Sequence, residues 1–435
     1  MRVSVIGTGY LGAVHAACMA ELGHEVLATD VDVARLESLS VGRAPFYEEG
    51  LPELLDRGLT TGRLRFTPSI REVGEFAEVH FICVGTPQQP DSGAADIRHI
   101  RSVVRELTPH LRTGCVVAGK STVPVGTAAR IKHEIAENID PGTEFAVAWN
   151  PEFLREGFAV RDTLRPDRVV IGVETLEAAD KLRAVYAPLL GETDLIVTDL
   201  ATAELAKVAA NSFLATKISF INAMAEICEV VGADVHSVAD CLGRDSRIGR
   251  SFLSAGLGFG GGCLSKDIRA FATAAEELGA GRSLRFLREV DAINLRCRDR
   301  TVDLARRLVG GSFTGRNIAV LGATFKPNTD DVRDSPALEV AASVQSEGAS
   351  VRLHDPRGID NAREVYPALN YVHEVGKACE GADLTLHLTD WDDYHDIDPA
   401  SLGSVTRCMS VLDARNSLDA PRWREAGWTV RVLGA

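Results

Sequence analysis

The sequence predicts an α/β protein with two doubly wound domains of parallel strands, joined by a central segment that contains one long helix. Short apolar runs that end in glycine or polar residues alternate with helical stretches over residues 1–200, and the same alternation returns over residues 311–435. Between them, residues 201–310 carry apolar residues at helical spacing. A chain of 435 residues is long enough for about three domains. We therefore expect domains at 1–200, 201–310 and 311–435.

The first 30 residues contain the clearest local pattern. A predicted strand at 3–6 runs into Gly7-Thr8-Gly9-Tyr10-Leu11-Gly12, a helix rich in small residues follows, and a second strand ends in Asp30. Glycines in this turn let the backbone approach a pyrophosphate, and the helix N-terminus adds a positive dipole end. Asp30 would accept hydrogen bonds from an adenosine ribose and would repel a 2′-phosphate. This Rossmann-like unit therefore favours NAD over NADP, against the alternative of an α/β domain without cofactor.

Further strands of the first domain are expected at 79–84, 115–120, 145–149, 169–172 and 195–198. Polar residues follow three of them, namely Thr86, Thr122 and the pair Glu152 and Glu156. Ligands of open α/β sheets lie outside the carboxyl ends of the strands, so these side chains fall on the expected functional edge. Each of them, taken singly, is equally explained as turn chemistry or a helix cap.

The central segment is predicted to begin with a helix of about 32 residues, up to Gly232, because neither proline nor glycine interrupts it. Such a helix spans roughly 45 Å at about 1.5 Å per residue, and it needs a flanking domain or another subunit on each side. Lys207 and Asn211 are four residues apart and share one helical face. The alternatives for this pair are a functional site and a solvated face.

A glycine-rich run with one cysteine, Gly258 to Asp267, interrupts the helical pattern. Its glycines let the backbone approach a ligand closely, and Cys263 stands near bare amides and a lysine that favour the reactive thiolate. A surface loop with an incidental cysteine is the alternative. Three arginines at 244, 247 and 250 precede the run, and they predict either a local phosphate pocket or an ordinary basic loop.

The second α/β domain is predicted to contain five strands, at 318–321, 351–354, 384–388, 411–413 and 429–432. The turn after its first strand lacks the G-x-G-x-x-G pattern. A second dinucleotide is therefore less expected there than another nucleotide or a structural role.

Composition excludes several classes of partner. The net charge of −14 argues against binding to nucleic acid or to an anionic membrane, so an anionic ligand would need a local basic pocket. No run of about 18 apolar residues predicts a membrane span. The nine cysteines are scattered without a CxxC pair, which indicates reduced thiols in the cytoplasm and neither a disulfide framework nor a zinc site. We expect no metal.

Seven segments together resemble the nucleotide-sugar 6-dehydrogenases, the UDP-glucose/GDP-mannose dehydrogenase family, over essentially the whole chain. They are Gly7–Gly12, Ser121–Gly126, Asn150–Gly157, Pro166–Gly172, Ala203–Lys207, Gly258–Asp267 and Phe325-Lys326. The resemblance is to the branch that acts on UDP-glucose, and it implies oxidation of the sugar C6 alcohol to a carboxylate with two NAD and no release of aldehyde. It also implies a homodimer or larger homo-oligomer built through the central helix. The alternatives are GDP-mannose or an N-acetylated UDP-sugar as substrate, a dehydrogenase that stops after one oxidation, and a nucleotide-sensing protein without activity.

The resemblance also implies residue roles. Cys263 would add to the aldehyde, and the thiohemiacetal would lose a second hydride to become a thioester. The other residues implied in catalysis stabilise charge on oxygen (Lys207, Asn211), hold a water (Asp267, Thr122) or assist thioester hydrolysis (Glu152, with Glu156 as the exchangeable alternative). Besides the glycine turn, the residues implied in NAD binding are Tyr10, Leu11, Asp30, Arg35, Thr86, Thr122, Glu156, Lys266 and Arg333. Arg35 stands where the family often has lysine.

The residues implied in substrate binding come from several segments and from both α/β domains. They are Glu152, Phe153, Leu154, Arg155, Glu156, Lys207, Asn211, Arg247, Phe252, Leu253, Ser254, Ala255, Gly256, Gly260, Lys326 and Arg415. Arg247 is similar to an arginine that the family lends across its dimer. The loop at 252–256 resembles the animal form of this segment, which differs in sequence from the form of many bacterial members.

Overall fold

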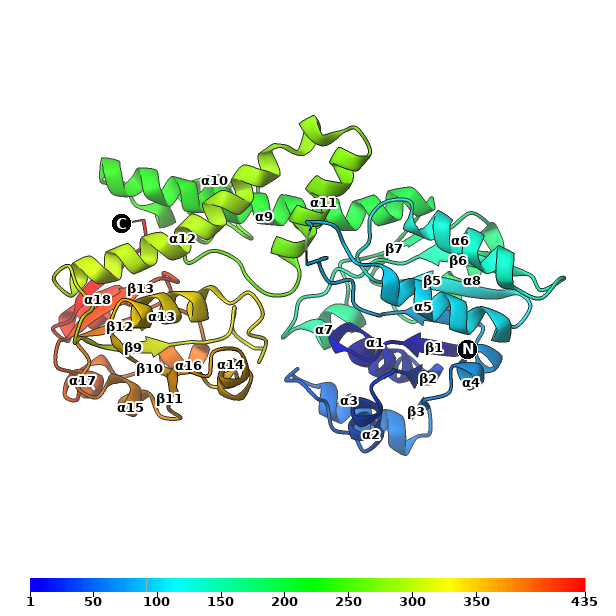
Figure 1. The fold of residues 1–435 in the computed structure, drawn as a ribbon, viewed down its shortest axis with the longest axis horizontal. Coiled ribbons are helices and arrows are strands. Elements are labelled where there is room, and N and C mark those ends of the chain that lie inside the picture. The colour runs from blue at the N-terminus through cyan, green and yellow to red at the C-terminus, as the bar shows by residue number, and fades with distance from the viewer. Residues whose placement is uncertain (91, 435) are drawn as a thin grey trace. The chain divides into compact units, whose positions relative to one another are not determined.

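The computed structural model describes residues 1–90 and 92–434 and divides into two compact units (Figure 1). Unit 1 consists of Met1–Ala210 and Arg269–Gly281, and unit 2 consists of Asn211–Ile268 and Arg282–Ala435. Each unit contains one sheet with helices around it, so the predicted α/β class is confirmed.

The sheet of unit 1 has eight strands in the order β3-β2-β1-β4-β5-β6-β7-β8. Neighbouring strands are parallel except for β6 and β7, which pair antiparallel at Trp149 and Gly172. The strands are β1 (Arg2–Ile6), β2 (Glu25–Thr29), β3 (Leu64–Phe66), β4 (Val79–Ile82), β5 (Cys115–Gly119), β6 (Phe145–Trp149), β7 (Arg168–Gly172) and β8 (Asp194–Thr198). The helices are α1 (Tyr10–Glu21), α2 (Val33–Ser40), α3 (Leu51–Thr60), α4 (Ile70–Phe76), α5 (Arg98–Leu107), α6 (Thr127–Asn138), α7 (Ala159–Leu164) and α8 (Leu176–Tyr186), with a 3-10 turn at Thr108–His110.

The core of unit 1 lies on both faces of this sheet. Side chains alternate across a strand, so consecutive residues of β1 enter different apolar clusters. Val5 packs in the cluster that contains α1, whereas Ile6 packs in the cluster that contains Trp149. Strand β1 is therefore buried on both sides, as is usual for strands of parallel sheets.

The sheet of unit 2 has six parallel strands in the order β11-β10-β9-β12-β13-β14. The strands are β9 (Asn317–Leu321), β10 (Ser350–His354), β11 (Asn370–Tyr371), β12 (Leu384–His387), β13 (Ser410–Asp413) and β14 (Thr429–Val432). The helices near it are α13 (Pro336–Ser346), α14 (Ile359–Val365), α15 (Val375–Cys379), α16 (Asp392–His395), α17 (Pro399–Gly403) and α18 (Ala420–Glu425).

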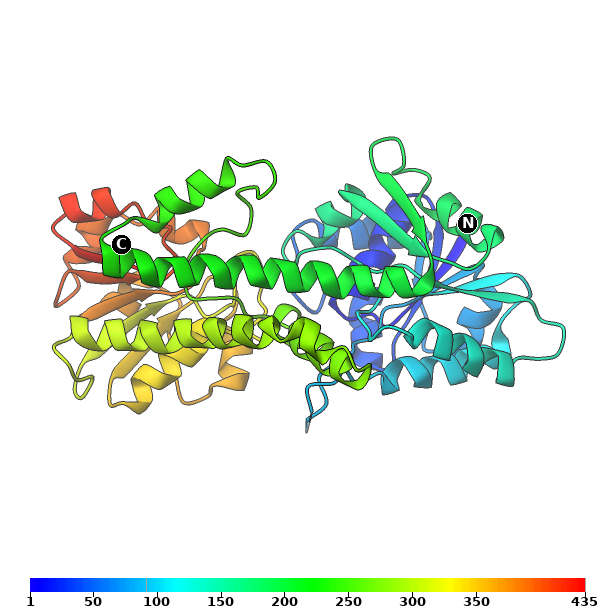
Figure 2. The same ribbon diagram turned by 90° about the horizontal axis from the view of Figure 1, so that it is seen from above.

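Four helices connect the two sheets in the sequence. They are α9 (Leu200–Val231), α10 (Val235–Gly243), α11 (Leu264–Glu277) and α12 (Phe286–Leu308), with a 3-10 turn at Gly281–Leu284. The predicted long helix is confirmed, because α9 has 32 residues. Within unit 2, α9 and α12 lie side by side (Figure 2), where Ser219 Oγ donates to the carbonyl of Val290 at 2.7 Å and Arg300 pairs with Glu229 at 2.8 Å.

Two strands were not predicted, and five were expected in the second sheet where the structure has six. The missed strands β3 and β11 contain only three and two residues. Segments this short do not establish a hydrophobic period, so tertiary pairing with β2 and β10 decides their structure.

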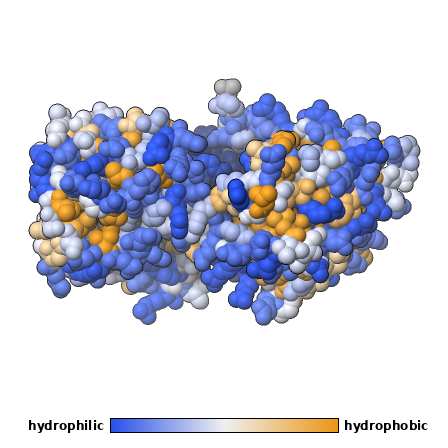
Figure 3. All heavy atoms as spheres, turned by 90° about the horizontal axis from the view of Figure 1, so that it is seen from below, coloured by the Kyte–Doolittle hydropathy of each residue, from blue (hydrophilic) through white to orange (hydrophobic). Residues whose placement is uncertain are grey.

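On the face drawn in Figure 3, hydrophilic residues cover most of the area and apolar residues form separate patches. Among residues 1–90 and 92–434, no helix has both the length and the apolar character needed to cross a membrane.

Candidate active site

The glycine turn of unit 1 joins β1 to α1. Gly7 has φ of 92°, and a Cβ on Gly12 would lie 1.8 Å from the carbonyl oxygen of Gly7, so no other residue fits either position. A Cβ on Gly9 would meet no protein atom within 4 Å. No side chain caps the N-terminus of α1. The first N–H groups of this helix are therefore available to an anion, which fits a dinucleotide pyrophosphate.

Asp30 stands at the end of β2, beside this turn. Its carboxylate accepts from the backbone N–H groups of Thr8 (2.6 Å) and Asp32 (3.0 Å), and from Arg35 Nη1 (3.2 Å). Burial alone would raise the pKa of Asp30, but these donors lower it overall. The carboxylate is thus held ionised, with Arg35 against it, and this suits the hydroxyls of a ribose better than a 2′-phosphate.

Side-chain hydrogen bonds of a threonine and a serine join the loops that follow β4 and β5. Thr86 Oγ1 donates to the carbonyl of Thr122 at 2.8 Å, and Ser121 Oγ donates to the carbonyl of Val84 at 2.6 Å. The two predicted threonines are therefore neighbours at the carboxyl edge of the sheet, where parallel strands place their ligand-binding residues.

Lys207 on α9 meets the loop that follows β6. Its Nζ lies 3.0 Å from Glu152 Oε1 and 5.5 Å from the centre of the Phe153 ring. Glu152 Oε2 also accepts from the N–H of Leu154 at 2.8 Å. Lys207 is only 5% exposed and Asn211, one helical turn later, is 6% exposed, so a solvated face does not describe this pair.

Arg155 behaves differently from its neighbours in the same loop. Its side chain forms a two-pronged ion pair with Asp162, at 2.7 and 2.8 Å, and its guanidinium lies 5.2 Å from the centre of the Phe158 ring. Glu156 is half-buried. The structure thus gives Arg155 a role in fixing the loop, beside any contact with a ligand.

Three buried polar residues of unit 1 were not assigned a role from the sequence. Lys120 directly follows β5 and donates to Asn150 Oδ1 at 3.0 Å, and burial lowers its pKa to about 8. Glu48 accepts from the N–H of Gly157 at 2.7 Å and from Tyr10 Oη. Glu204 accepts from the N–H groups of Gly126 and Ala128, both at 2.6 Å. Of these three residues, only Glu204 belongs to a segment that resembles the family, Ala203–Lys207, so only its role could have been predicted from the sequence.

In unit 2, the cysteine run leads directly into α11. Cys263 is exposed, whereas Asp267 is 2% exposed and accepts from Asn211 Nδ2 at 2.7 Å and from Lys266 Nζ at 2.6 Å. The N–H of Asp267 donates to the carbonyl of Cys263 at 2.9 Å, in the first turn of the helix. Three of the predicted residues, Asn211, Lys266 and Asp267, therefore contact one another, and the last two lie in the helical turn that follows Cys263.

The glycines of this run pack against the segment 325–334 of the same unit. A Cβ on Gly260 would lie 2.2 Å from the carbonyl oxygen of Asp334, and one on Gly262 would lie 2.7 Å from the Arg333 guanidinium. Gly261 has φ of 81° and faces the Phe325 ring. The run is predicted to let a ligand approach the backbone, and the structure adds a second reason for glycine, because the segment 325–334 requires it at three positions.

The basic residues predicted to contact ligands in unit 2 also have protein partners. Arg333 pairs with Asp331 at 2.5 Å, and Lys326 Nζ lies 5.8 Å from the centre of the Phe325 ring. Arg415 donates to the carbonyls of Leu388 (2.6 Å), Gly258 (3.1 Å) and Phe325 (3.1 Å). Arg415 thus uses three of its five N–H donors to join the cysteine run to residues 325 and 388.

The loop at 252–256 is held by asparagines. The N–H of Gly256 donates to Asn222 Oδ1 at 2.8 Å, and Asn416 Nδ2 donates to the carbonyl of Ala255 at 3.2 Å. Phe252, with φ of 65°, is one of the few non-glycine residues in the left-handed region, while Leu253 is buried and Ser254 is exposed.

Two of the three arginines that precede the run pair with nearby carboxylates. Arg247 pairs with Asp245 at 2.6 Å, and Arg250 pairs with Asp240 on α10 at 2.7 Å. A phosphate would have to compete with these carboxylates for the two guanidinium groups. Among the described residues, no group of three or more His, Cys, Asp and Glu could hold a metal ion.

Comparison with known proteins gives matches along the whole chain. Three domain models of the UDP-glucose/GDP-mannose dehydrogenase family match it: the NAD binding domain over residues 1–190, the central domain over 201–296 and the UDP binding domain over 319–420. A UDP-glucose 6-dehydrogenase of Rhizobium meliloti (strain 1021) is 40% identical over 96% of this chain and 95% of its own length. One from Pseudomonas aeruginosa is 40% identical over 100% of this chain and 97% of its own. A solved UDP-glucose dehydrogenase from the archaeon Pyrobaculum islandicum is 38% identical, with a TM-score of 0.90 over 98% of both chains.

Proposed function

Because the chain belongs to the UDP-glucose/GDP-mannose dehydrogenase family, we propose that it oxidises the C6 alcohol of UDP-glucose to a carboxylate and so forms UDP-glucuronate. Each turnover takes up one water and two NAD⁺ and releases two NADH and three protons. The observation that carries the proposal is the cysteine run, in which exposed Cys263 lies one helical turn before buried Asp267, the acceptor of Asn211. A dehydrogenase that stops after one oxidation has no use for this thiol.

The glycine turn of unit 1 fits NAD, because Gly7 and Gly12 cannot be replaced and the start of α1 has no side-chain cap. We propose that Asp30 holds the adenosine ribose, with Arg35 at its edge. The further NAD contacts that we propose are Leu11, Thr86, Thr122, Glu156, Lys266 and Arg333. When bound, NAD accepts a hydride in each of the two oxidations.

In the first oxidation, the alcohol loses its O–H proton and a hydride. We propose that Lys207 and Asn211 donate hydrogen bonds to the substrate oxygen while negative charge develops on it. The proton leaves through a water that Asp267 and Thr122 hold. The burial of the lysine and asparagine supports this role, since donors in a dry site stabilise charge more strongly than donors in water.

In the second half of the reaction, the Cys263 thiolate forms a bond to the aldehyde carbon, and the carbonyl oxygen takes up a proton. The resulting tetrahedral carbon then loses a hydride and its hydroxyl group loses a proton, which leaves a thioester on Cys263. Water then adds to the thioester carbon, the C–S bond breaks, and the thiol is regenerated with the carboxylate. We propose that Glu152, paired with Lys207 at 3.0 Å, assists this hydrolysis; Glu156 is the alternative.

Substrate contacts are proposed from the resemblance of the chain to its family. They are Phe153, Leu154 and Arg155 after β6, Arg247, residues 252–256, Gly260, Lys326 and Arg415. A steady-state assay of the purified protein with UDP-glucose, GDP-mannose and UDP-N-acetylmannosamine tests this choice of substrate. We expect kcat/KM to be at least tenfold higher with UDP-glucose. A preference for either of the other sugars would contradict the proposal.

We further propose a homodimer or larger homo-oligomer through α9. In unit 2, Phe213, Phe220 and Ile227 are spaced seven residues apart on this helix and are 67%, 47% and 55% exposed. Three large apolar side chains on one helical face predict a helical partner. Phe220→Glu should lower the molar mass measured by light scattering. Val365→Glu, at a 57% exposed position on α14, is the matched control, and an unchanged mass in Phe220→Glu would contradict this interface.

We also propose that the segment 1–200 binds NAD, that 201–310 supplies the cysteine run and that 311–435 binds the UDP-sugar.

No disulfide joins the nine cysteines, and Cys263 must be reduced to act. We therefore place the protein in a reducing compartment, the cytoplasm. A mild oxidant should inactivate it, and a thiol reductant should restore its activity.

A further inference from the structure

A second polar pair lies on α12, four residues apart, and it faces the cysteine run. Asn294 is 0% exposed and Arg298 is 5% exposed, although α12 carries many charged and exposed residues. Buried amide and guanidinium groups must be hydrogen-bonded, because leaving them without partners is costly. Their partners are therefore informative, and neither residue belongs to the machinery proposed above.

Asn294 binds the backbone of Phe259 through both ends of its amide. Its Oδ1 accepts from the N–H of Phe259 at 2.7 Å, and its Nδ2 donates to the carbonyl of the same residue at 3.0 Å. A Cβ on the preceding Gly258 would lie 2.4 Å from Asn294 Oδ1, so this close approach requires glycine. The helix thus fixes the chain four residues before Cys263.

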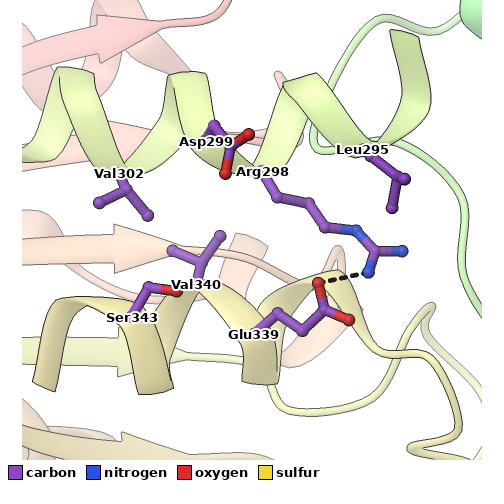
Figure 4. A pocket seen from close by; sticks show the side chains of 7 residues that line it. All are labelled: Leu295, Arg298, Asp299, Val302, Glu339, Val340 and Ser343. Carbon is purple, nitrogen blue, oxygen red and sulfur yellow. Dashed lines mark ion pairs between the residues drawn. The ribbon is translucent and has the colours of Figure 1, made fainter. Parts of the chain in front are cut away.

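Arg298 fixes the chain on the other side of the thiol. Its Nη2 donates to Asp334 Oδ1 at 3.0 Å, while Asp334 Oδ2 accepts from Ser265 Oγ at 2.7 Å. Ser265 lies two residues after Cys263, in the first turn of α11. Figure 4 shows the Arg298 side chain reaching from α12 to Glu339 on α13, where the two groups pair at 2.5 Å.

We propose that Asn294, Arg298 and Asp334 are positioning residues that hold the Cys263 thiol in place for its attack on the aldehyde. The inference rests on the proposed role of Cys263. Three glycines stand between the two anchored points, Phe259 and Ser265, and glycine backbone has more freedom than that of any other residue. A nucleophile on such a run needs anchors from outside, since a misplacement of about 1 Å can cost about a hundredfold in rate.

Single-turnover kinetics test this role, because the thiol is needed only after the first oxidation. The variants are Ser265→Ala, Asp334→Ala and the double variant, with enzyme in excess over UDP-glucose and NADH followed by absorbance. We expect the first NADH to form within twofold of the wild-type rate and the second to form at least tenfold more slowly. The double variant should be no slower than the slower single variant, because both remove one linkage.

Asp299→Ala is the matched control, since Asp299 is the exposed neighbour of Arg298 and lines the same small cavity of about 120 Å³ (Figure 4). It should leave both NADH phases unchanged. A purely structural role for the linkage would lower both phases together through a smaller active fraction. That outcome, or multiplicative effects in the double variant, would overturn the proposal.

Hydrogen exchange measured without substrate keeps the inference separate from the proposed function. Backbone amides of residues 259–262 should exchange at least tenfold faster in Ser265→Ala and Asp334→Ala than in the wild type, with the sheets unaffected. Unchanged exchange would overturn the anchoring even if the kinetics follow the expected pattern. If the wild type forms only one NADH, the function of Cys263 fails, and the exchange rates still decide whether the linkage anchors the run.

Discussion

Lys120 is a buried cation whose removal should change how the stability of the protein depends on pH. It is 5% exposed, and its ammonium lies 3.0 Å from Asn150 Oδ1 and 3.4 Å from Tyr186 Oη, with no carboxylate in ion-pair distance among the described residues. Burial lowers its pKa from 10.5 to about 8. The folded protein therefore binds this proton less tightly than the unfolded chain does. It follows that the contribution of Lys120 to the free energy of unfolding rises with pH between about 8 and 10.5.

The size of the effect follows from the shift. The difference between a pKa of 10.5 and one of about 8 corresponds to roughly 3 kcal/mol. Lys120→Met keeps the length of the side chain and does not titrate. Urea unfolding of both proteins, from pH 7.5 to 10.5, should show the wild type gaining roughly 3 kcal/mol relative to the variant. At pH 7.5 the variant should be at least as stable as the wild type, because it buries no charge.

Comparison with the variant cancels the titration of every other group, provided that the two proteins have equal m-values. A difference between the two proteins that stays constant with pH, or that falls as pH rises, would refute the reasoning. It would show that Lys120 keeps its charge inside the fold up to the pH at which the unfolded chain loses it.

Two further predictions concern the cofactor and the oxyanion. Gly12→Ala should lower both the melting temperature and the affinity for NAD, whereas Gly9→Ala, whose Cβ meets no protein atom within 4 Å, should weaken only NAD binding. Thermal denaturation measures the first property and fluorescence titration the second. Wild-type affinity for NAD in Gly9→Ala would be evidence against the pyrophosphate site. Asn211→Ala should lower kcat about a hundredfold with KM for UDP-glucose within about threefold, because the donor acts on developing charge. A raised KM with unchanged kcat would assign Asn211 to substrate binding instead.

Local patterns explain why so much of the fold could be predicted. The glycine turn with Asp30 and the uninterrupted run that forms α9 are encoded within stretches of about 30 residues, and both are present in the structure. Strands β3 and β11 were missed because two or three residues do not show a period, and their pairing partners determine them.

The candidate site shows the limits of sequence reasoning more clearly. Lys207, Asn211 and Cys263 stood out through residue type and spacing. By contrast, Arg298 meets Asp334 across 36 positions of the chain, and Ser265 meets it across 69. No local pattern marks such contacts. The same applies to the glycines of the cysteine run, whose need for space comes from Asp334, Phe325 and Arg333 and could not be read from the run itself.

The central claim is that Cys263 captures an aldehyde between two oxidations. The most direct test is the number of NADH formed per UDP-glucose consumed, measured to completion in the wild type and in Cys263→Ser. We predict two NADH per sugar in the wild type. In Cys263→Ser, the second oxidation should stop while the first continues at a reduced rate. One NADH per sugar in the wild type, or full conversion to the carboxylate by the serine variant, would contradict the account.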